Sequence, residues 1–172
     1  MIVQPTSLLE KAVSLLSRRD YSRAELQRRL QSFLRKPLRE HQDTFSESIG
    51  HEEDVQKHAE QIAAVLTRLE ELGYLNDDRV SASTVRVGIA KGQGPQRIKA
   101  ELKHKVLSTD VLHEVEDELD WFAQARQVRS RRFGDALPDT PKEKARQLRF
   151  LLYRGFTQQQ ALQALKINEW DE

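Results

Sequence analysis

The sequence predicts an all-α protein of about eight or nine helices, arranged in series as three small bundles. Three observations support this fold class. A helix-turn-helix signature occurs three times, at residues 19–22, 91–94 and 154–157. Apolar residues recur at the spacing of amphipathic helices, and no segment alternates apolar and polar residues as a strand does. Because turns this short place consecutive helices antiparallel, each signature is expected to mark one helix pair.

Each signature carries a residue suited to capping the helix that follows. Two of them have Ser or Thr at the cap and Glu or Gln three residues later, which is the spacing of a reciprocal capping box. The middle signature has Gly at the cap and Pro at the first helical position, where the missing N–H of proline is not needed. The residues expected to form these structural caps are Ser22, Glu25, Gly94, Pro95, Thr157 and Gln160.

Apolar stripes and helix-ending residues order the elements along the chain. Pro37 is expected to end the second helix, and the polar stretch around it predicts a flexible loop over residues 37–54. Gly73 is expected to end the third helix, and either Asn76 or Asp77 to cap the fourth. The stripes run through residues 8–16, 26–34, 55–72, 80–89, 98–102, 112–122, 145–152 and 161–165.

Two adjacent aromatic residues, Trp121 and Phe122, are expected in different environments. Phe122 falls on the apolar stripe of residues 112–122, which favours a place in the core over stacking on a base. Trp121 is turned from it by about 100° around the helix, which predicts a place between bundles or at a contact surface.

Charge is segregated along the chain although the formal net charge is only +1. Residues 86–105 hold six Lys or Arg against one acid, and residues 121–134 hold four Arg and no acid. Residues 108–120 hold six acids and no Lys or Arg. Such a chain could contact a polyanion with some surfaces and a basic protein surface with others.

Catalytic and metal-binding patterns are missing from the sequence. There is no cysteine, which excludes disulfides, thiol nucleophiles and thiolate metal sites. His51, Asp54 and His58 could share a helix face, but a solvated junction is favoured over a metal site. No phosphate loop, dinucleotide fingerprint or catalytic motif appears, so we expect no enzyme activity, no cofactor and no metal. Without a signal sequence or a long apolar run, a soluble cytoplasmic protein is expected.

Basic residues recur along helix faces in all three predicted bundles. Lys142, Arg146, Arg149 and Tyr153 follow one another at steps of four, three and four, and shorter stripes occur elsewhere. A second stripe joins Arg126 and Arg129 to either Arg131 or Arg132. Each stripe alone is typical of a solvated face, but their recurrence favours a long polyanionic or filamentous partner. The candidate contact residues are Arg18, Arg19, Arg28, Arg86, Lys91, Arg97, Lys99, Lys103, Arg126, Arg129, Lys142, Arg146, Arg149 and Arg154.

Four segments, residues 73–77, 91–98, 120–126 and 149–156, together resemble the RecX family of bacterial recombination regulators. The resemblance spans nearly the whole chain in the family's order. It implies three tandem three-helix repeats that form an elongated, curved molecule. The repeats are expected at residues 1–74, 75–117 and 118–172.

The resemblance also implies a function. The expected partner is the RecA recombinase filament on single-stranded DNA, which such proteins enter along the helical groove. Binding is expected to inhibit the ATPase, recombinase and coprotease activities of RecA and so to modulate recombination, DNA repair and the SOS response. The protein is expected to be a monomer, to bind DNA weakly and to have no membrane partner.

Two positions depart from the family pattern. Val80–Ser81 stands where an aromatic residue is common, and Lys105–Val106 stands where a Lys-Gly helix end is usual. The second departure is expected to loosen the turn that follows.

Two other classes of function stay open at this point. The chain could be an autonomous DNA-binding protein, without sequence specificity, that competes for single-stranded DNA. In that case naked DNA would bind as well as the filament, with steep salt dependence. It could also be a scaffold that contacts proteins only, without affinity for DNA.

Overall fold

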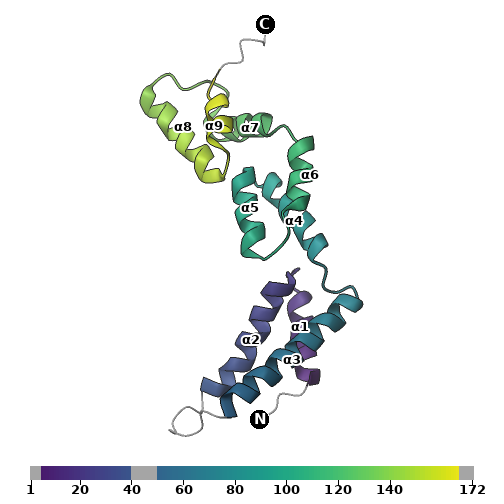
Figure 1. The fold of residues 1–172 in the computed structure, drawn as a ribbon. Coiled ribbons are helices and arrows are strands. Elements are labelled where there is room, and N and C mark those ends of the chain that lie inside the picture. Colours follow the sequence, from purple (N-terminus) through teal and green to yellow (C-terminus); the bar gives the residue numbers. More distant parts are fainter. Residues whose placement is uncertain (1–4, 40–49, 167–172) are drawn as a thin grey trace. The chain divides into compact units, whose positions relative to one another are not determined.

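The computed structural model describes residues 5–39 and 50–166, with side chains for residues 7–34 and 54–166. Every regular element in these residues is a helix, so the predicted all-α class is confirmed (Figure 1). The helices are α1 (Pro5–Leu16), α2 (Arg23–Arg39), α3 (Gly50–Glu71), α4 (Asp77–Ala90), α5 (Pro95–His104), α6 (Asp110–Glu118), α7 (Trp121–Phe133), α8 (Pro141–Arg154) and α9 (Gln158–Gln163). The chain divides into two compact units, residues 1–80 and 81–172. The bounds of the three expected repeats stay a prediction.

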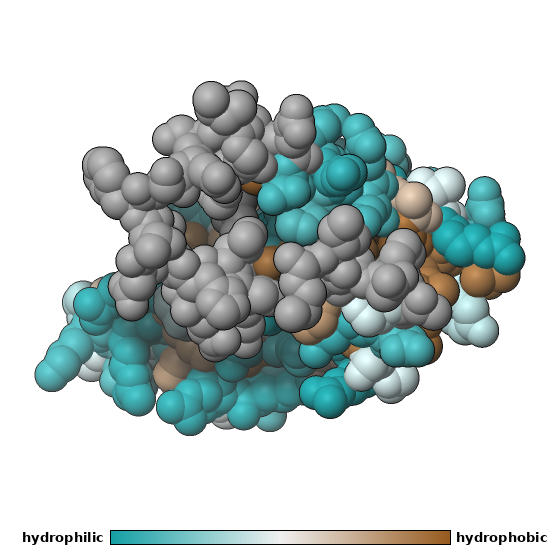
Figure 2. Space-filling model, turned by 90° about the horizontal axis from the view of Figure 1, so that it is seen from below, coloured by the Kyte–Doolittle hydropathy of each residue, from teal (hydrophilic) through white to brown (hydrophobic). Residues whose placement is uncertain are grey.

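The first unit is a bundle in which α1, α2 and α3 pack against one another. Its core contains leucines from all three helices, among them Leu8, Leu30 and Leu66, each at most 1% exposed. This burial removes the apolar stripes of the three helices from water, which is the main source of stability for such short elements. In the view of Figure 2, hydrophilic residues cover much of the coloured surface, with hydrophobic residues showing between them.

A capping box starts α2. The Glu25 N–H donates to Ser22 Oγ at 3.2 Å, and the Ser22 N–H donates to Glu25 Oε2 at 3.1 Å. Tyr21, directly before the cap, is buried in the same core as Leu26. Two orphan amides of the helix start are therefore satisfied where the chain turns into the core.

The start of α4 is tied to the start of α2. Of the two expected caps, Asn76 is the one that caps α4, because its Oδ1 accepts the Arg79 N–H at 2.8 Å. Asp77 instead accepts the N–H of Arg23, the first residue of α2, at 2.8 Å. Arg23 also forms an ion pair with Glu70 of α3. The end of α3 and the two helix starts are therefore joined by polar contacts within the first unit.

The predicted loop over residues 37–54 is too long. Helix α2 continues through Pro37 to Arg39, and α3 begins at Gly50, while residues 40–49 lie outside the described part of the chain. Pro37 lacks the N–H that would bond one turn back, and the helix ends two residues later. A proline so close to the end of a helix removes one hydrogen bond there and leaves the preceding turns intact.

In the second unit, the middle and last signature turns meet backbone to backbone. The Gly94 N–H donates to the Arg154 carbonyl at 2.8 Å, and the Gln96 N–H donates to the Gly155 carbonyl at 3.0 Å. These bonds satisfy amides at the start of α5 with carbonyls at the end of α8. Each helix end therefore supplies the partners that the other lacks within its own helix.

Both glycines are needed for this approach. A Cβ at Gly94 would lie 2.3 Å from the Phe156 backbone nitrogen, and a Cβ at Gly155 would lie 2.4 Å from the Arg97 Cβ. Gly155 also has φ +92°, a left-handed conformation that side chains disfavour. The contact between the turns is closer than any residue with a side chain would allow.

The helices around this contact begin as the sequence predicts. Gly94 is the N-cap of α5 with Pro95 at the first helical position, and Thr157 with Gln160 forms a complete capping box at α9. Helices α7, α8 and α9 pack against one another, and α5 packs against α6. The two signature turns are therefore held between rigid helix ends.

Phe122 is not in the core where it was expected, and burial excludes an exposed contact surface for Trp121, while its expected place between bundles stays a prediction. Trp121 is 5% exposed and lies on a buried stripe with Ala125 and Val128, whereas Phe122 is half-buried. The prediction from the apolar stripe of residues 112–122 assumed one continuous helix. Helix α6 ends at Glu118, and α7 restarts at Trp121 behind the cap Asp120 with a new phase.

The turn after α5 is not loosened by Val106. The Val106 N–H donates to the Lys103 carbonyl and the Leu107 N–H to the Leu102 carbonyl, both at 3.0 Å. This is the Schellman pattern that Gly155 also forms at the end of α8. Val106 adopts it with φ +57°, an outlying conformation for a β-branched side chain. The turn therefore keeps its hydrogen bonds with Val106 in place of glycine, at the cost of backbone strain at Val106.

We expect the Gly155→Ala substitution to destabilise the protein more than Gly73→Ala does. Both glycines end a helix with positive φ, but a Cβ at Gly73 would meet nothing within 4 Å. Gly73→Ala should cost about 1 kcal/mol through backbone conformation alone. Gly155→Ala should cost roughly 1–3 kcal/mol more, because the two turns must separate. Chemical denaturation of both variants measures the difference, and equal losses would contradict the close contact.

We expect Val106→Gly to stabilise the protein by about 1 kcal/mol. The substitution removes a β-branched side chain from a left-handed backbone conformation, which relieves strain. Part of that gain in stability is offset by the greater conformational freedom of glycine in the unfolded chain. Val87→Gly, at an exposed position within α4, is the matched control and should destabilise by about 0.5 kcal/mol. Thermal unfolding of the two variants checks the opposite signs; a loss of stability in both would show that Val106 is unstrained.

Candidate functional site

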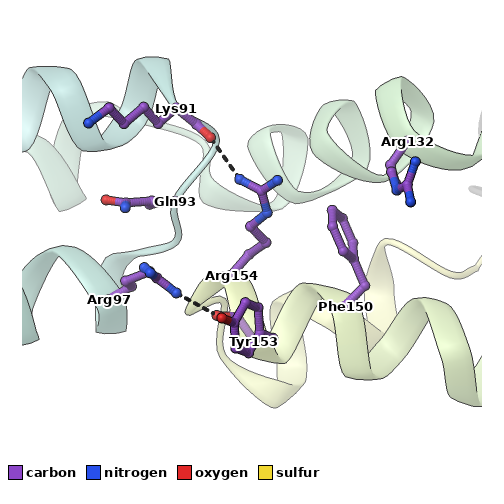
Figure 3. A pocket seen from close by; sticks show the side chains of 7 residues that line it. All are labelled: Lys91, Gln93, Arg97, Arg132, Phe150, Tyr153 and Arg154. Atoms are coloured by element: carbon purple, nitrogen blue, oxygen red, sulfur yellow. Dashed lines mark hydrogen bonds between the residues drawn. The ribbon is translucent and has the colours of Figure 1, made fainter.

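Three of the candidate contact residues, Lys91, Arg97 and Arg154, come together with Arg132 around one pocket of the second unit (Figure 3). The pocket has a volume of about 630 Å3. Its cations come from the end of α4, from α5, from α7 and from the end of α8. Residues far apart in the sequence meet here because the two signature turns are docked on each other.

The remaining lining residues are Gln93 and the aromatic residues Phe150 and Tyr153, so no acid among the described residues lines the pocket. Phe150 is half-buried and meets the ring of Phe133 edge to face, with 5.2 Å between the ring centroids. Tyr153 is 76% exposed, the highest value among the large hydrophobic side chains of the described residues. The pocket therefore combines positive charge with aromatic surface.

Two of the four cations are held in place by the turns. Arg154 Nη1 donates to the Lys91 carbonyl at 3.0 Å, and Arg97 Nη1 donates to the Tyr153 carbonyl at 3.3 Å. The Arg154 guanidinium lies 5.2 Å from the Phe150 ring centroid, and that of Arg97 lies 5.5 Å from the Tyr153 ring centroid. Cation–π contacts and hydrogen bonds to carbonyls orient these side chains without neutralising them.

Positive charge is uncompensated at this site. None of the four cations forms an ion pair with a described residue, and each is at least partly accessible to water. Like charges gathered in one concave site raise the local potential and attract anions. Arginine guanidinium groups suit phosphate, which they can bind through two parallel N–H donors. The arrangement is therefore suited to an extended phosphate-bearing ligand.

Arg129 is a structural residue, and its assignment as a contact residue is corrected. It is 5% exposed, and its Nη1 and Nη2 donate to the carbonyls of Ala136 and Asp135 at 3.0 and 2.9 Å. The guanidinium thereby holds the segment after α7 against that helix. Arg132, which had been an alternative to Arg131 in this stripe, lines the pocket instead.

The predicted stripe of Lys142, Arg146, Arg149 and Tyr153 lies on an exposed face of α8. Arg146 forms an ion pair with Glu143 at 3.2 Å and lies 5.5 Å from the Phe133 ring centroid. Arg149 Nε donates to the Ala145 carbonyl at 3.3 Å. Tyr153 is the member of the predicted stripe that reaches the pocket. The other candidates are exposed (Arg18, Arg28, Arg86, Lys103 and Lys142) or half-buried (Lys99 and Arg126), and none of them lines the pocket.

Arg19 contributes to the first signature turn. Its Nη2 lies 3.4 Å from Glu25 Oε1, and its guanidinium lies 3.8 Å from the Tyr21 ring centroid. Burial lowers the pKa of this guanidinium, but the hydrogen bond with Tyr21 and the charge of Glu25 raise it above its ordinary value. Arg19 therefore stays charged and is engaged by the capping box.

Three lining residues, Gln93, Phe150 and Arg132, were not predicted as members of a single site. Phe150 and Gln93 belonged to the family-like segments, but their spacing gives no sign that they approach each other. Among the described residues, no group of three His, Cys, Asp or Glu could hold a metal, and the side chain of His51 lies outside that part. None of the described helices is both long and apolar enough to span a membrane.

Comparisons with known proteins give consistent results. The family profile described as RecX, third three-helix domain, matches residues 118–165. The regulatory protein RecX of Serratia proteamaculans is 39% identical over 157 residues, covering 89% of this chain and 92% of the relative. That of Halorhodospira halophila is 36% identical, covering 95% and 89%. The crystal structure of RecX from Lactobacillus salivarius has a TM-score of 0.62, 17% identity and 93% coverage of both chains, a likeness of fold.

We expect Arg129→Lys to destabilise the protein by about 1–3 kcal/mol. A lysine ammonium cannot reproduce the planar fork that satisfies both carbonyls, which leaves buried polar groups unpaired. Arg131→Lys, two residues further along the same helix and exposed, is the matched control and should change stability by less than about 0.5 kcal/mol. Urea unfolding measures both, and an Arg129→Lys variant as stable as the control would contradict the structural role.

Proposed function

Because the chain belongs to the RecX family of regulatory proteins, we propose that it binds the RecA filament on single-stranded DNA and inhibits RecA. The inhibited activities are the ATPase, recombinase and coprotease activities, through which the protein modulates recombination, DNA repair and the SOS response. The observation that carries this proposal is the identity of 39% with a regulatory protein RecX over nearly the full length of both chains.

The mechanism is binding without chemistry. The protein bridges neighbouring RecA subunits, restricts the change of state that ATP hydrolysis requires, and blocks filament extension or promotes disassembly. Several weak contacts on one chain gain from high effective concentration once the first has formed. The protein acts as a monomer in the cytoplasm, and no cofactor takes part.

The distribution of charge supports a partner made of both protein and DNA. In the part of the chain that the structure describes, the pocket of the second unit presents four cations and no acid. Helix α6 carries the opposite charge, with Asp110, Glu114, Glu116, Asp117 and Glu118 within nine residues. A basic site suits the phosphates of the DNA, and an acidic helix suits basic surfaces of the recombinase.

The alternative is an autonomous DNA-binding protein that competes with RecA for single-stranded DNA. The basic and aromatic lining of the pocket favours it, since both features are typical of single-strand binding. The net charge of +1 counts against it, because proteins that bind DNA on their own are commonly more basic.

ATP hydrolysis by preformed RecA filaments on single-stranded DNA tests the proposal. Titration with this protein should inhibit hydrolysis well below one molecule per RecA, because each molecule affects several subunits. The inhibition should survive an excess of free single-stranded DNA. Inhibition that the free DNA abolishes would favour the competing alternative, and an unchanged rate throughout would contradict both.

A further inference from the structure

We propose that the pocket lined by Lys91, Arg132 and Tyr153 binds one unpaired nucleotide of single-stranded DNA (Figure 3). The Tyr153 ring stacks on the base, and Lys91 and Arg132 contact phosphates on either side of it. This inference deepens the proposed function, on which it rests for the choice of DNA as the partner.

Lys91 and Arg132 are the outer cations of the pocket. Among the described residues, the Lys91 ammonium and the Arg132 guanidinium have no hydrogen-bond or ion-pair partner. In Figure 3 they lie at opposite sides of the view, with Arg154, Phe150 and Tyr153 between them. Two uncommitted cations on either side of aromatic rings match the order of phosphate, base and phosphate along a strand.

The Tyr153 side chain is exposed at the pocket. Three quarters of this side chain is accessible, although large aromatic side chains are usually buried to a greater extent. Its backbone carbonyl and its ring are both engaged by Arg97, which fixes the position of the ring without covering it. A fixed and accessible ring is the kind of platform on which proteins stack unpaired bases.

The size and the lining of the pocket distinguish between possible occupants. A pocket of about 630 Å3 lies within the roughly 300–1,000 Å3 typical of small-ligand sites, which suits one nucleotide better than a helix. An acidic peptide would use the four cations and leave the rings without a function. A DNA duplex keeps its bases stacked inside, so it could meet the cations and the Tyr153 hydroxyl with its phosphates but could not stack a base on the Tyr153 ring. Single-stranded DNA is the occupant that uses both.

The fixed orientation of Arg97 and Arg154, the two cations held by carbonyls, also favours binding. Arg154 bonds the Lys91 carbonyl, and this bond joins the end of α8 to the end of α4. The pocket is therefore formed before any ligand arrives, which lowers the entropy lost on binding.

The test is fluorescence anisotropy of labelled oligothymidylate with the full-length protein. Tyr153→Leu should weaken binding about fivefold or more, and Tyr153→Phe should bind as the wild type does because stacking is kept. Lys91→Gln and Arg132→Gln should each reduce the slope of log affinity against log salt by about 0.7. Arg131→Gln, next to Arg132 and outside the pocket, is the matched control and should leave the slope unchanged.

Other probes decide between occupants. Tyr153→Leu should weaken binding of a duplex of the same length no more than Tyr153→Phe does, because a duplex stacks no base on the ring. Equal binding by Tyr153→Leu and wild type, or an equal loss in the Arg131→Gln control, would overturn the nucleotide site. Displacement of the oligonucleotide by polyglutamate at equal charge concentration would overturn it in favour of an acidic protein segment.

The RecA assay separates this inference from the proposed function. If the wild type inhibits RecA and Tyr153→Leu inhibits and binds oligonucleotide equally well, the nucleotide site fails and the proposed function stands. If the variants change oligonucleotide binding as expected while the wild type leaves RecA hydrolysis unchanged, the site stands and the proposed function fails.

Discussion

Two helix-turn-helix turns of the second unit meet backbone to backbone at Gly94 and Gly155, and the unit depends on this contact. The amides at the start of α5 donate to carbonyls at the end of α8, so two helix ends satisfy each other. A side chain at either glycine would collide with the facing turn. The repeated turn is thus both a connection within each helix pair and the surface through which two pairs join.

The pocket is a consequence of the same contact. Docking the turns brings Lys91 and Arg97 beside Arg154, Phe150 and Tyr153, and the hydrogen bonds that orient the cations cross the junction. Positive charge collects there because the guanidinium groups are held by carbonyls and aromatic rings and form no ion pair with a carboxylate of residues 5–39 or 50–166. The residues that stabilise the junction therefore also set the electrostatic character of the site.

The helical spacing of the basic residues predicted which of them are exposed. That prediction of exposure failed for residues near a helix boundary. Arg129 follows the spacing of a charged stripe, yet it is buried because the chain after α7 folds back and presents two carbonyls to it. Phe122 lies outside the core expected for it and Trp121 is buried, because the break between α6 and α7 resets the helical phase. Periodicity describes one helix at a time and carries no information about what packs on it.

The sequence by itself determined the all-α class, the caps of the signature helices and the family, since each depends on local spacing or on ordered motifs along the chain. Capping boxes are local because a side chain and the amides it satisfies lie three residues apart. The tertiary structure alone decided that two glycine-containing turns dock, that Arg132 and not Arg131 joins the pocket, and that Arg129 is structural. These outcomes depend on contacts between residues about 60 positions apart or on a chain reversal, which no local pattern specifies.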